Sequence, residues 1–243
     1  MNLLKALLFV AMMLQPWYKD QKTETHEQRV DRYTVISSSI VKAADSATCT
    51  GSYQNNPYCS PIWKGKREEL GFLLLTQAYM ESRFARNVHA GNCEKHQCDA
   101  YKDKTGKILH RSASIWQVQS TGKGGLIPRS EWVALQGLDQ QSTDGAAWAA
   151  TKVLSSAYRQ CRTIPGAISL YAGIPRCDWP RASYRNSFYE RLLRKGKRAH
   201  ANGYQRNPTA KDKKKDAKDP VKIATITIGS ETCDVTKYGL ICN

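Results

Sequence analysis

Glu81 is the residue whose position points most directly to chemistry. It ends a mostly apolar stretch, residues 73–80, whose side chains suit the interior of a helical protein. A carboxyl group at the end of such a helix is removed from water on one side, and desolvation raises its pKa. A carboxylic acid that stays protonated near neutral pH can donate a proton to a glycosidic oxygen. The alternative is that Glu81 is a solvated surface residue, since most glutamates are exposed.

The elements that must position Glu81 follow from apolar periodicity and from the turn residues between periodic segments. Residues 47–65, rich in Cys, Pro, Gly, Ser and Asn, are expected to form a loop, and residues 102–107 a hairpin turn. Ser142 or Thr143 is expected to cap one of the helices. The pattern predicts helices at Thr34–Ala44, Arg67–Phe84, Ser130–Leu135, Ser142–Cys161, Ile164–Leu170 and Ser183–Leu193.

Three later segments accompany Glu81-Ser82 in a fixed order: Ser114–Val118, Ile168–Gly173 and Tyr184–Leu192. Over residues 67–194, the ordered set resembles the soluble lytic transglycosylase domain, the goose-type branch of the lysozyme superfamily. The resemblance implies a mainly α (α+β lysozyme-like) fold. In it, a helical bundle surrounds a central helix that ends at the catalytic Glu, and a small irregular or β insertion forms one lobe of the cleft.

The resemblance also implies roles for individual residues. Glu81 matches the general acid/base, and the substrate-binding positions fall on Ser82, Trp116, Gln117 and Tyr171. Other roles stay open, because Trp116 and Tyr171 could be core aromatic residues, Ser82 could only satisfy the helix end, and Gln117 could lie in a solvated loop or a half-buried strand. The chain departs from the family around Tyr171, with Leu-Tyr in place of Tyr-Asn, and in the long insertion between Glu81 and Gln117.

The number of carboxylates determines which reaction is expected. Most glycosidases use two, whereas a lytic transglycosylase, by family resemblance, uses one, which also deprotonates the sugar's 6-hydroxyl and gives a 1,6-anhydro product. Asp99 and Asp103 are the candidates for a second carboxylate, with Glu94 beside Cys93, and each is also explained as a loop residue. We therefore expect a peptidoglycan lytic transglycosylase that cleaves the MurNAc–GlcNAc β-1,4 bond, with a hydrolytic muramidase as the alternative.

Eight cysteines fall into four pairs of near neighbours, which predicts four short loops closed by disulfides: Cys49–Cys59, Cys93–Cys98, Cys161–Cys177 and Cys233–Cys242. Disulfides indicate an oxidising compartment; reduced cysteines packed as small apolar residues are the alternative. His89, Cys93, His96 and Cys98 are of the types that bind zinc. Their spacing is not a common one, so a disulfide with solvated histidines is favoured and no cofactor is expected.

Composition divides the chain into four parts. Residues 1–33 join a short apolar stretch that resembles a secretory signal to a polar leader. No clear cleavage site follows, so an uncleaved anchor or a helix docked on the body is the alternative. Residues 34–194 are the expected catalytic domain. Residues 195–222 are expected to be a basic, flexible linker, and residues 223–243 a small terminal β-hairpin that contains two cysteines.

The formal net charge of +16 favours a polyanionic partner: nucleic acid, an anionic membrane surface or an anionic cell-wall polymer. The basic tail lacks interleaved aromatic residues and no nucleic-acid motif is recognised, so we expect peptidoglycan glycan strands and no specific nucleic acid. The tail could dock the protein on a virion or a secretion apparatus. The expected location is the periplasm, the exterior, or a virion acting at the bacterial envelope. A catalytically silent lysozyme-like component of a larger assembly, structural or glycan-binding, is the third class of function.

Overall fold

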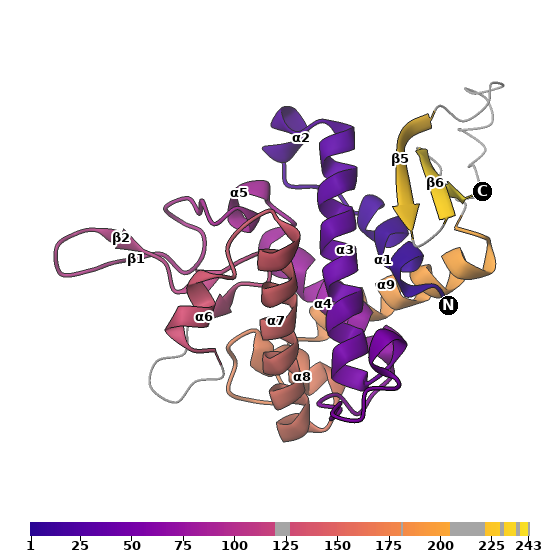
Figure 1. The fold of residues 1–243 in the computed structure, drawn as a ribbon. Coiled ribbons are helices and arrows are strands. Elements are labelled where there is room, and N and C mark those ends of the chain that lie inside the picture. Colours follow the sequence, from indigo (N-terminus) through magenta and orange to yellow (C-terminus); the bar gives the residue numbers. More distant parts are fainter. Residues whose placement is uncertain (120–126, 181, 205–221, 229–230, 237–238, 243) are drawn as a thin grey trace.

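The protein is mainly helical, with 56% helix and 9% strand, which confirms the expected fold class. The computed structural model describes residues 1–119, 127–180, 182–204, 222–228, 231–236 and 239–242 (Figure 1). In this part of the chain the helices are α1 (Leu3–Met12), α2 (Asp20–Thr23), α3 (His26–Thr48), α4 (Arg67–Ser82), α5 (Arg86–His89), α6 (Arg129–Val133), α7 (Gln140–Cys161), α8 (Ile164–Tyr171) and α9 (Ala182–Ala201), with one 3-10 turn at Gly51–Tyr53.

The strands are short and form three small antiparallel sheets. They are β1 (Tyr101–Lys102) with β2 (Ile108–Leu109), β3 (Ser112–Ala113) with β4 (Val118–Gln119), and β5 (Lys222–Ile228), β6 (Glu231–Thr236) and β7 (Gly239–Cys242) in that order. The first two sheets lie in the insertion that follows α5, and the third is C-terminal.

Helix α4 occupies the centre of the bundle, as the apolar stretch before Glu81 predicts. It contacts α1, α3, α7 and α9, and residues 70–78 are all buried. Helix α9 can approach α4 closely because residue 196 is glycine. A Cβ atom at Gly196 would lie 2.0 Å from Cζ of Phe72, which is too close for two carbon atoms that are not bonded to each other.

Several helix ends differ from the expected ones. Helix α3 begins at His26, where Thr25 and Gln28 form a capping box, because Val30 and Tyr33 already lie on its buried face. Helix α7 begins at Gln140 and is capped by Asp139, so the expected caps at 142 and 143 are wrong. Helix α9 continues to Ala201, so the first part of the expected linker is helical; residues 205–221 lie outside the described residues.

Helix α1 packs into the body of the protein. Leu3, Leu7, Leu8 and Val10 are almost completely buried, and α1 contacts α3, α4 and α9. Lys5 is also buried and forms an ion pair with Glu231 of the C-terminal sheet. Among the described residues, no helix is both long enough and apolar enough to cross a bilayer.

The C-terminal strands form a sheet, as the alternation of residues 223–228 predicts, with β7 as a third strand. Apolar side chains of this sheet, among them Ile226, Val235 and Leu240, belong to the main core. Strand β5 contacts α3 and β7 contacts α1. The terminal segment therefore packs against the helices (Figure 1).

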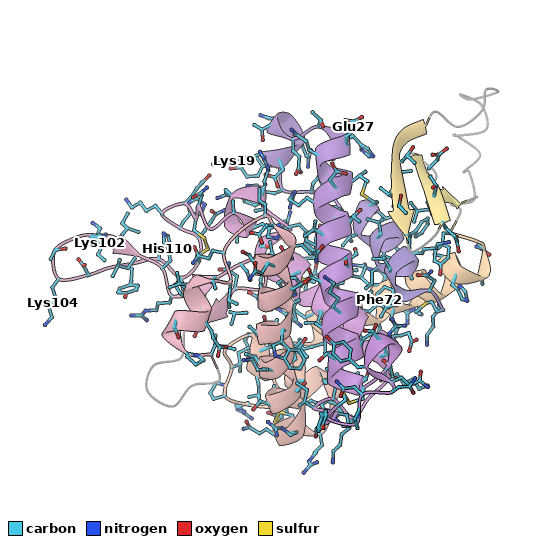
Figure 2. The ribbon with its side chains drawn as sticks, in the orientation of Figure 1. Lys19, Glu27, Phe72, Lys102, Lys104 and His110 are labelled. Carbon is cyan, nitrogen blue, oxygen red and sulfur yellow. A yellow bond between two sulfur atoms is a disulfide. The ribbon has the colours of Figure 1, made fainter. Side chains whose placement is uncertain are left out.

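The insertion carries a hairpin that projects from the body (Figures 1 and 2). Its turn is held by the Asp103 carboxylate, which accepts the backbone N–H groups of Thr105 at 2.8 Å and of Lys107 at 3.0 Å. Lys102 and Lys104 point away from the protein near the hairpin tip (Figure 2). The predicted hairpin turn is thus confirmed.

Candidate active site

Glu81 lies in the last turn of α4, where the helix stops abruptly. Arg83 and Phe84 follow it with positive φ angles of 50° and 56°. The Ser82 hydroxyl donates to the carbonyl of Ala78 at 2.8 Å and accepts the N–H of Phe84 at 3.1 Å. Ser82 therefore satisfies the helix end, the alternative left open for it, while its side chain also borders the cavity beside Glu81.

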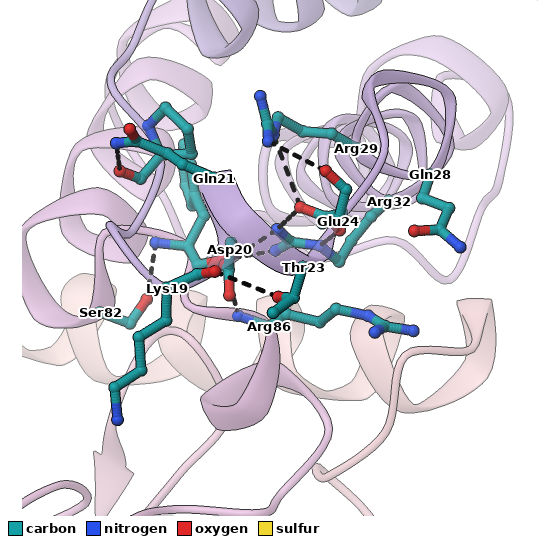
Figure 3. A network of polar contacts seen from close by, with 12 residues as sticks. Lys19, Asp20, Gln21, Thr23, Glu24, Gln28, Arg29, Arg32, Ser82 and Arg86 are labelled. Atoms are coloured by element: carbon teal, nitrogen blue, oxygen red, sulfur yellow. Dashed lines mark hydrogen bonds and ion pairs between the residues drawn. The ribbon is translucent and has the colours of Figure 1, made fainter.

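Three buried charged residues, Asp20, Glu24 and Arg32, which we call the Arg32 cluster, contact the backbone that follows Glu81 (Figure 3). Arg32 forms two bonds of 2.7 Å with Glu24 and donates to the carbonyl of Phe84. Asp20 accepts the backbone N–H of Arg86 at 2.9 Å and lies 3.4 Å from Arg32. Burial raises the pKa of Asp20, opposed by the Arg86 N–H and by Arg32. Neither Arg83 nor Phe84 is a glycine, so their positive φ angles are maintained by these tertiary contacts.

Arg185 of α9 is the immediate partner of Glu81. Its Nη1 donates to Oε1 of Glu81 and, at 3.2 Å, to Oε1 of Gln77, one turn earlier on α4. The side chains of Glu81 and Arg185 are only 18% and 25% exposed. Burial raises the pKa of the Glu81 carboxyl, the charge and hydrogen bond of Arg185 oppose this rise, and the nearby charge of Asp99 adds to it. Burial has the largest effect, as expected for an acid that ends an apolar helix.

Two cavities, of about 360 Å³ and about 320 Å³, meet at Glu81. Glu81, Asp99 and Gln117 border both of them, so we treat the two cavities as one cleft and call it the Glu81 cleft. Trp17 borders the first cavity and Tyr171 the second. A ligand that occupied both cavities would therefore lie beside Glu81.

Asp99 belongs to the Glu81 cleft, and Asp103 does not. Asp99 directly follows the disulfide-bonded Cys98 and has a positive φ of 50°. Its Oδ2 accepts hydrogen bonds from the hydroxyl of Ser112 and, at 3.0 Å, from Nε2 of Gln119. Asp103 lies on the hairpin turn and borders neither cavity, which removes it as a second carboxylate.

Gln117 lies in the turn between β3 and β4, not on the half-buried strand considered for it, and has a positive φ of 50°. Its Nε2 donates to the carbonyl of Ser114 at 2.9 Å. The Tyr171 hydroxyl donates to the carbonyl of Trp116 at 2.7 Å and so supports the same turn. Burial and the negative charge of Glu81 raise the pKa of Tyr171, which keeps the phenol neutral. Gln117 and Tyr171 are therefore both held beside the carboxyl.

Trp116 is a core residue. Its side chain is fully buried, and Nε1 donates to the carbonyl of Leu74 on α4 at 3.0 Å. The substrate-binding role expected for Trp116 is therefore wrong, and its function is to anchor the insertion against the central helix. The large apolar area of an indole favours such burial.

The zinc site considered as an alternative for His89, Cys93, His96 and Cys98 is also wrong. Cys93 and Cys98 form a disulfide, so neither supplies a thiolate. His89 is buried with Nε2 2.9 Å from the Thr143 hydroxyl, and burial lowers its pKa to about 3. His96 is exposed beside the first cavity. In the described part of the chain, no group of three His, Cys, Asp or Glu residues is arranged to bind a metal ion.

Three of the four predicted disulfides are present: Cys49–Cys59, Cys93–Cys98 and Cys161–Cys177. For the fourth pair, the register of the C-terminal sheet aligns Cys233 with Cys242, and Cys233 is disulfide-bonded; the side chain of Cys242 lies outside the described residues. Disulfides at these positions are compatible with an oxidising compartment.

Arg185 and Trp17 are site residues that were not predicted from the sequence. Arg185 precedes Phe188 and Leu192 by three and seven residues, so it shares their buried helix face. An arginine on an apolar helix face is the signal that could have identified Arg185, whereas the neighbouring Tyr184 is 67% exposed. Trp17 had no such signal, because it lies within residues 1–33, which were expected to be a signal-like or anchor segment and a polar leader.

Comparisons of the chain with protein-family models, with curated proteins and with solved structures found no match.

Proposed function

We propose that the protein cleaves the β-1,4 bond between MurNAc and GlcNAc in peptidoglycan, with Glu81 as the proton donor and acceptor. The observation that carries the proposal is the place of Glu81 in the Glu81 cleft. Its carboxyl ends a buried helix, burial raises its pKa, and it borders both of the cavities that form the cleft. A raised pKa is what a general acid needs in order to be protonated near neutral pH.

The reaction proposed is that of a lytic transglycosylase. Protonated Glu81 gives its proton to the glycosidic oxygen as the bond from that oxygen to C1 of MurNAc breaks. The carboxylate then takes the proton of the MurNAc 6-hydroxyl, whose oxygen forms a bond to C1. The products are a GlcNAc hydroxyl end and a 1,6-anhydro end, Glu81 is protonated again, and no water is consumed.

Arg185 has a defined part in this scheme. Its hydrogen bonds to Glu81 and Gln77 fix the side chain of the acid toward one position. Its charge also stabilises the carboxylate that forms in the first proton transfer, whereas burial favours the return of a proton to that carboxylate in the second step. Burial and Arg185 thus act in opposite directions on one group that must both donate and accept a proton.

A hydrolytic muramidase is the second candidate, and Asp99 is the observation that favours it. Asp99 borders both cavities together with Glu81, and two carboxylates that flank the scissile bond are the usual equipment of a glycoside hydrolase. In that case Asp99 would act as nucleophile or base, and water would be consumed.

The cellular setting proposed is the bacterial envelope. The disulfides suit an exported or virion-borne protein, and the net charge of +16 suits an anionic cell wall. Docking on a virion or a secretion apparatus through the basic tail is part of the same proposal.

The test is mass spectrometry of purified murein after incubation with the protein. We expect 1,6-anhydro ends from the native chain and a loss of at least about 100-fold in rate for Glu81→Gln, the scale of an acid–base contribution. Glu190→Gln, an exposed glutamate on α9, is the matched control and keeps the native rate. Reducing ends together with a similar loss in Asp99→Asn would replace the transglycosylase by the hydrolase. Intact murein with the native chain would leave a silent structural or glycan-binding component, and full activity in Glu81→Gln would refute Glu81 as the catalytic acid.

A further inference from the structure

Trp17 is far from Glu81 in sequence but borders the same cavity. That cavity, of about 360 Å³, is also bordered by Gln97, Asp99 and Gln117. The Trp17 side chain is partly exposed and packs against a small apolar cluster formed by Ala85, Val88 and Cys98. One part of the indole is therefore supported by the protein, while another part is available to whatever occupies the cavity.

The segment that carries Trp17, residues 15–24, is tied to the elements around the cleft. The hydroxyl of Tyr79 on α4 donates to the carbonyl of Gln15 at 3.1 Å. The Lys19 ammonium lies 2.5 Å from the carboxylate of Glu94 in the insertion. The Arg32 cluster adds the contacts of α2 with α3 and with the turn after Glu81 (Figure 3). The chain before and after Trp17 is thus fixed, to α4 through Gln15 and to the insertion through Lys19.

The chemistry of this cavity wall suits a sugar. A pyranose ring has an apolar face of C–H groups and a rim of hydroxyl and amide groups. A flat indole can cover the face, while the side chains of Gln97, Asp99 and Gln117 offer donors and acceptors to the rim. Tyr171 borders the other cavity, so each of the two cavities that Glu81 borders has an aromatic side chain in its wall.

We propose that Trp17 binds a sugar ring of the glycan strand on one side of the scissile bond, and that residues 15–24 are a structural part of the site. The inference rests on the proposed function and extends it to a segment outside residues 67–194. Its immediate consequence is that removal of this segment would take one wall from the Glu81 cleft and loosen the turn behind the acid.

The experiment measures binding to the full chain without turnover. Glu81→Gln is titrated with chitohexaose, a soluble oligomer of GlcNAc, by isothermal calorimetry. We expect the added substitution Trp17→Ala to raise Kd about tenfold and Trp17→Phe to raise it about threefold, because a phenyl ring covers less of the sugar face. The added substitution Tyr58→Ala is the aromatic control: Tyr58 is 93% exposed, borders neither cavity, and should leave Kd unchanged.

The outcomes separate this inference from the function on which it rests. Equal Kd values for Glu81→Gln with and without Trp17→Ala overturn the role of Trp17 and leave the function standing. An absence of chitohexaose binding by Glu81→Gln itself overturns both. Circular dichroism checks the fold of each variant. If Trp17→Ala does not fold, Trp17→Phe decides: a threefold rise in Kd supports the inference and an unchanged Kd overturns it.

Discussion

The contact between Glu81 and Arg185 predicts how activity should depend on pH. In the proposed reaction the protonated form of Glu81 is the acid, so the rate falls as pH rises through the pKa of Glu81. Arg185 lowers that pKa against the effect of burial. Arg185→Met removes the charge and the hydrogen bond, so the pKa of Glu81 rises and the alkaline fall in rate moves to higher pH.

The magnitude follows from the geometry of the pair. An opposite charge in contact with a carboxylate lowers its pKa by about 1 to 3. Because both side chains keep some contact with water, 18% and 25% exposed, we expect the lower end of this range, a displacement of about 1 pH unit. That displacement corresponds to about 1.4 kcal/mol of differential stabilisation of the carboxylate. One pH unit above the native midpoint, Arg185→Met should retain about five times more of its own maximal rate than the native chain does.

The assay is the initial rate of murein clearing across pH, with each variant normalised to its own plateau. Normalisation is needed because loss of the bond to Gln77 also frees the Glu81 side chain and lowers the plateau. Arg185→Lys keeps the charge and should keep the native midpoint. Arg194→Met removes an exposed arginine from the same helix. Nine residues of helix place it about 13 Å further along the axis, beyond the screening length of about 8 Å at physiological salt, so its midpoint should also be native.

A midpoint in Arg185→Met that equals the native one would refute this reasoning. It would mean either that Arg185 does not control the ionisation of Glu81, or that another group sets the alkaline limb. An equal displacement in Arg194→Met would show a general effect of net charge in place of a contact.

The remaining predictions concern stability and the insertion. Gly196→Ala should destabilise the fold by about 1–3 kcal/mol in urea unfolding, because its Cβ meets Phe72. Gly145→Ala in α7, whose nearest contact is an ordinary 3.4 Å, should be neutral or stabilising; equal effects would contradict the close approach of α9 to α4. For Glu81, folding raises the pKa, so the protonated form stabilises the fold below the unfolded-state pKa and this stability is lost as pH rises through the folded-state pKa. Glu81→Gln should therefore gain stability over the native chain as pH rises through that window, by about 1.4 kcal/mol for each unit between the two pKa values; a pH-independent difference in urea midpoints would argue against a desolvated acid. Asp103→Ala should open the hairpin turn and leave murein clearing within about twofold, whereas a large loss would restore Asp103 as a second carboxylate.

Features that depend on near neighbours in the chain could be predicted. The apolar run before Glu81 predicted a central helix, because a helix without a polar face must be surrounded by other elements. The spacing of cysteines predicted three disulfide loops that the structure contains. Turn chemistry at residues 102–107 predicted the hairpin. Helix ends were less well predicted, as at His26 and Asp139, because a cap is chosen by the geometry of the preceding loop.

The candidate site needed the tertiary structure. Arg185 is 104 residues from Glu81, and only the packing of α9 on α4 brings them together. Asp99 and Asp103 are equivalent as acids of one insertion, and the fold alone places the first in the Glu81 cleft and the second on an outer turn. For the same reason, Trp116 is a core anchor instead of the expected substrate-binding residue, and Trp17, for which no role was predicted, borders the cleft. Residue types and local spacing thus determined the helices, the short disulfides and the helix-end acid, whereas the contacts that give this acid its surroundings arise from packing between distant segments.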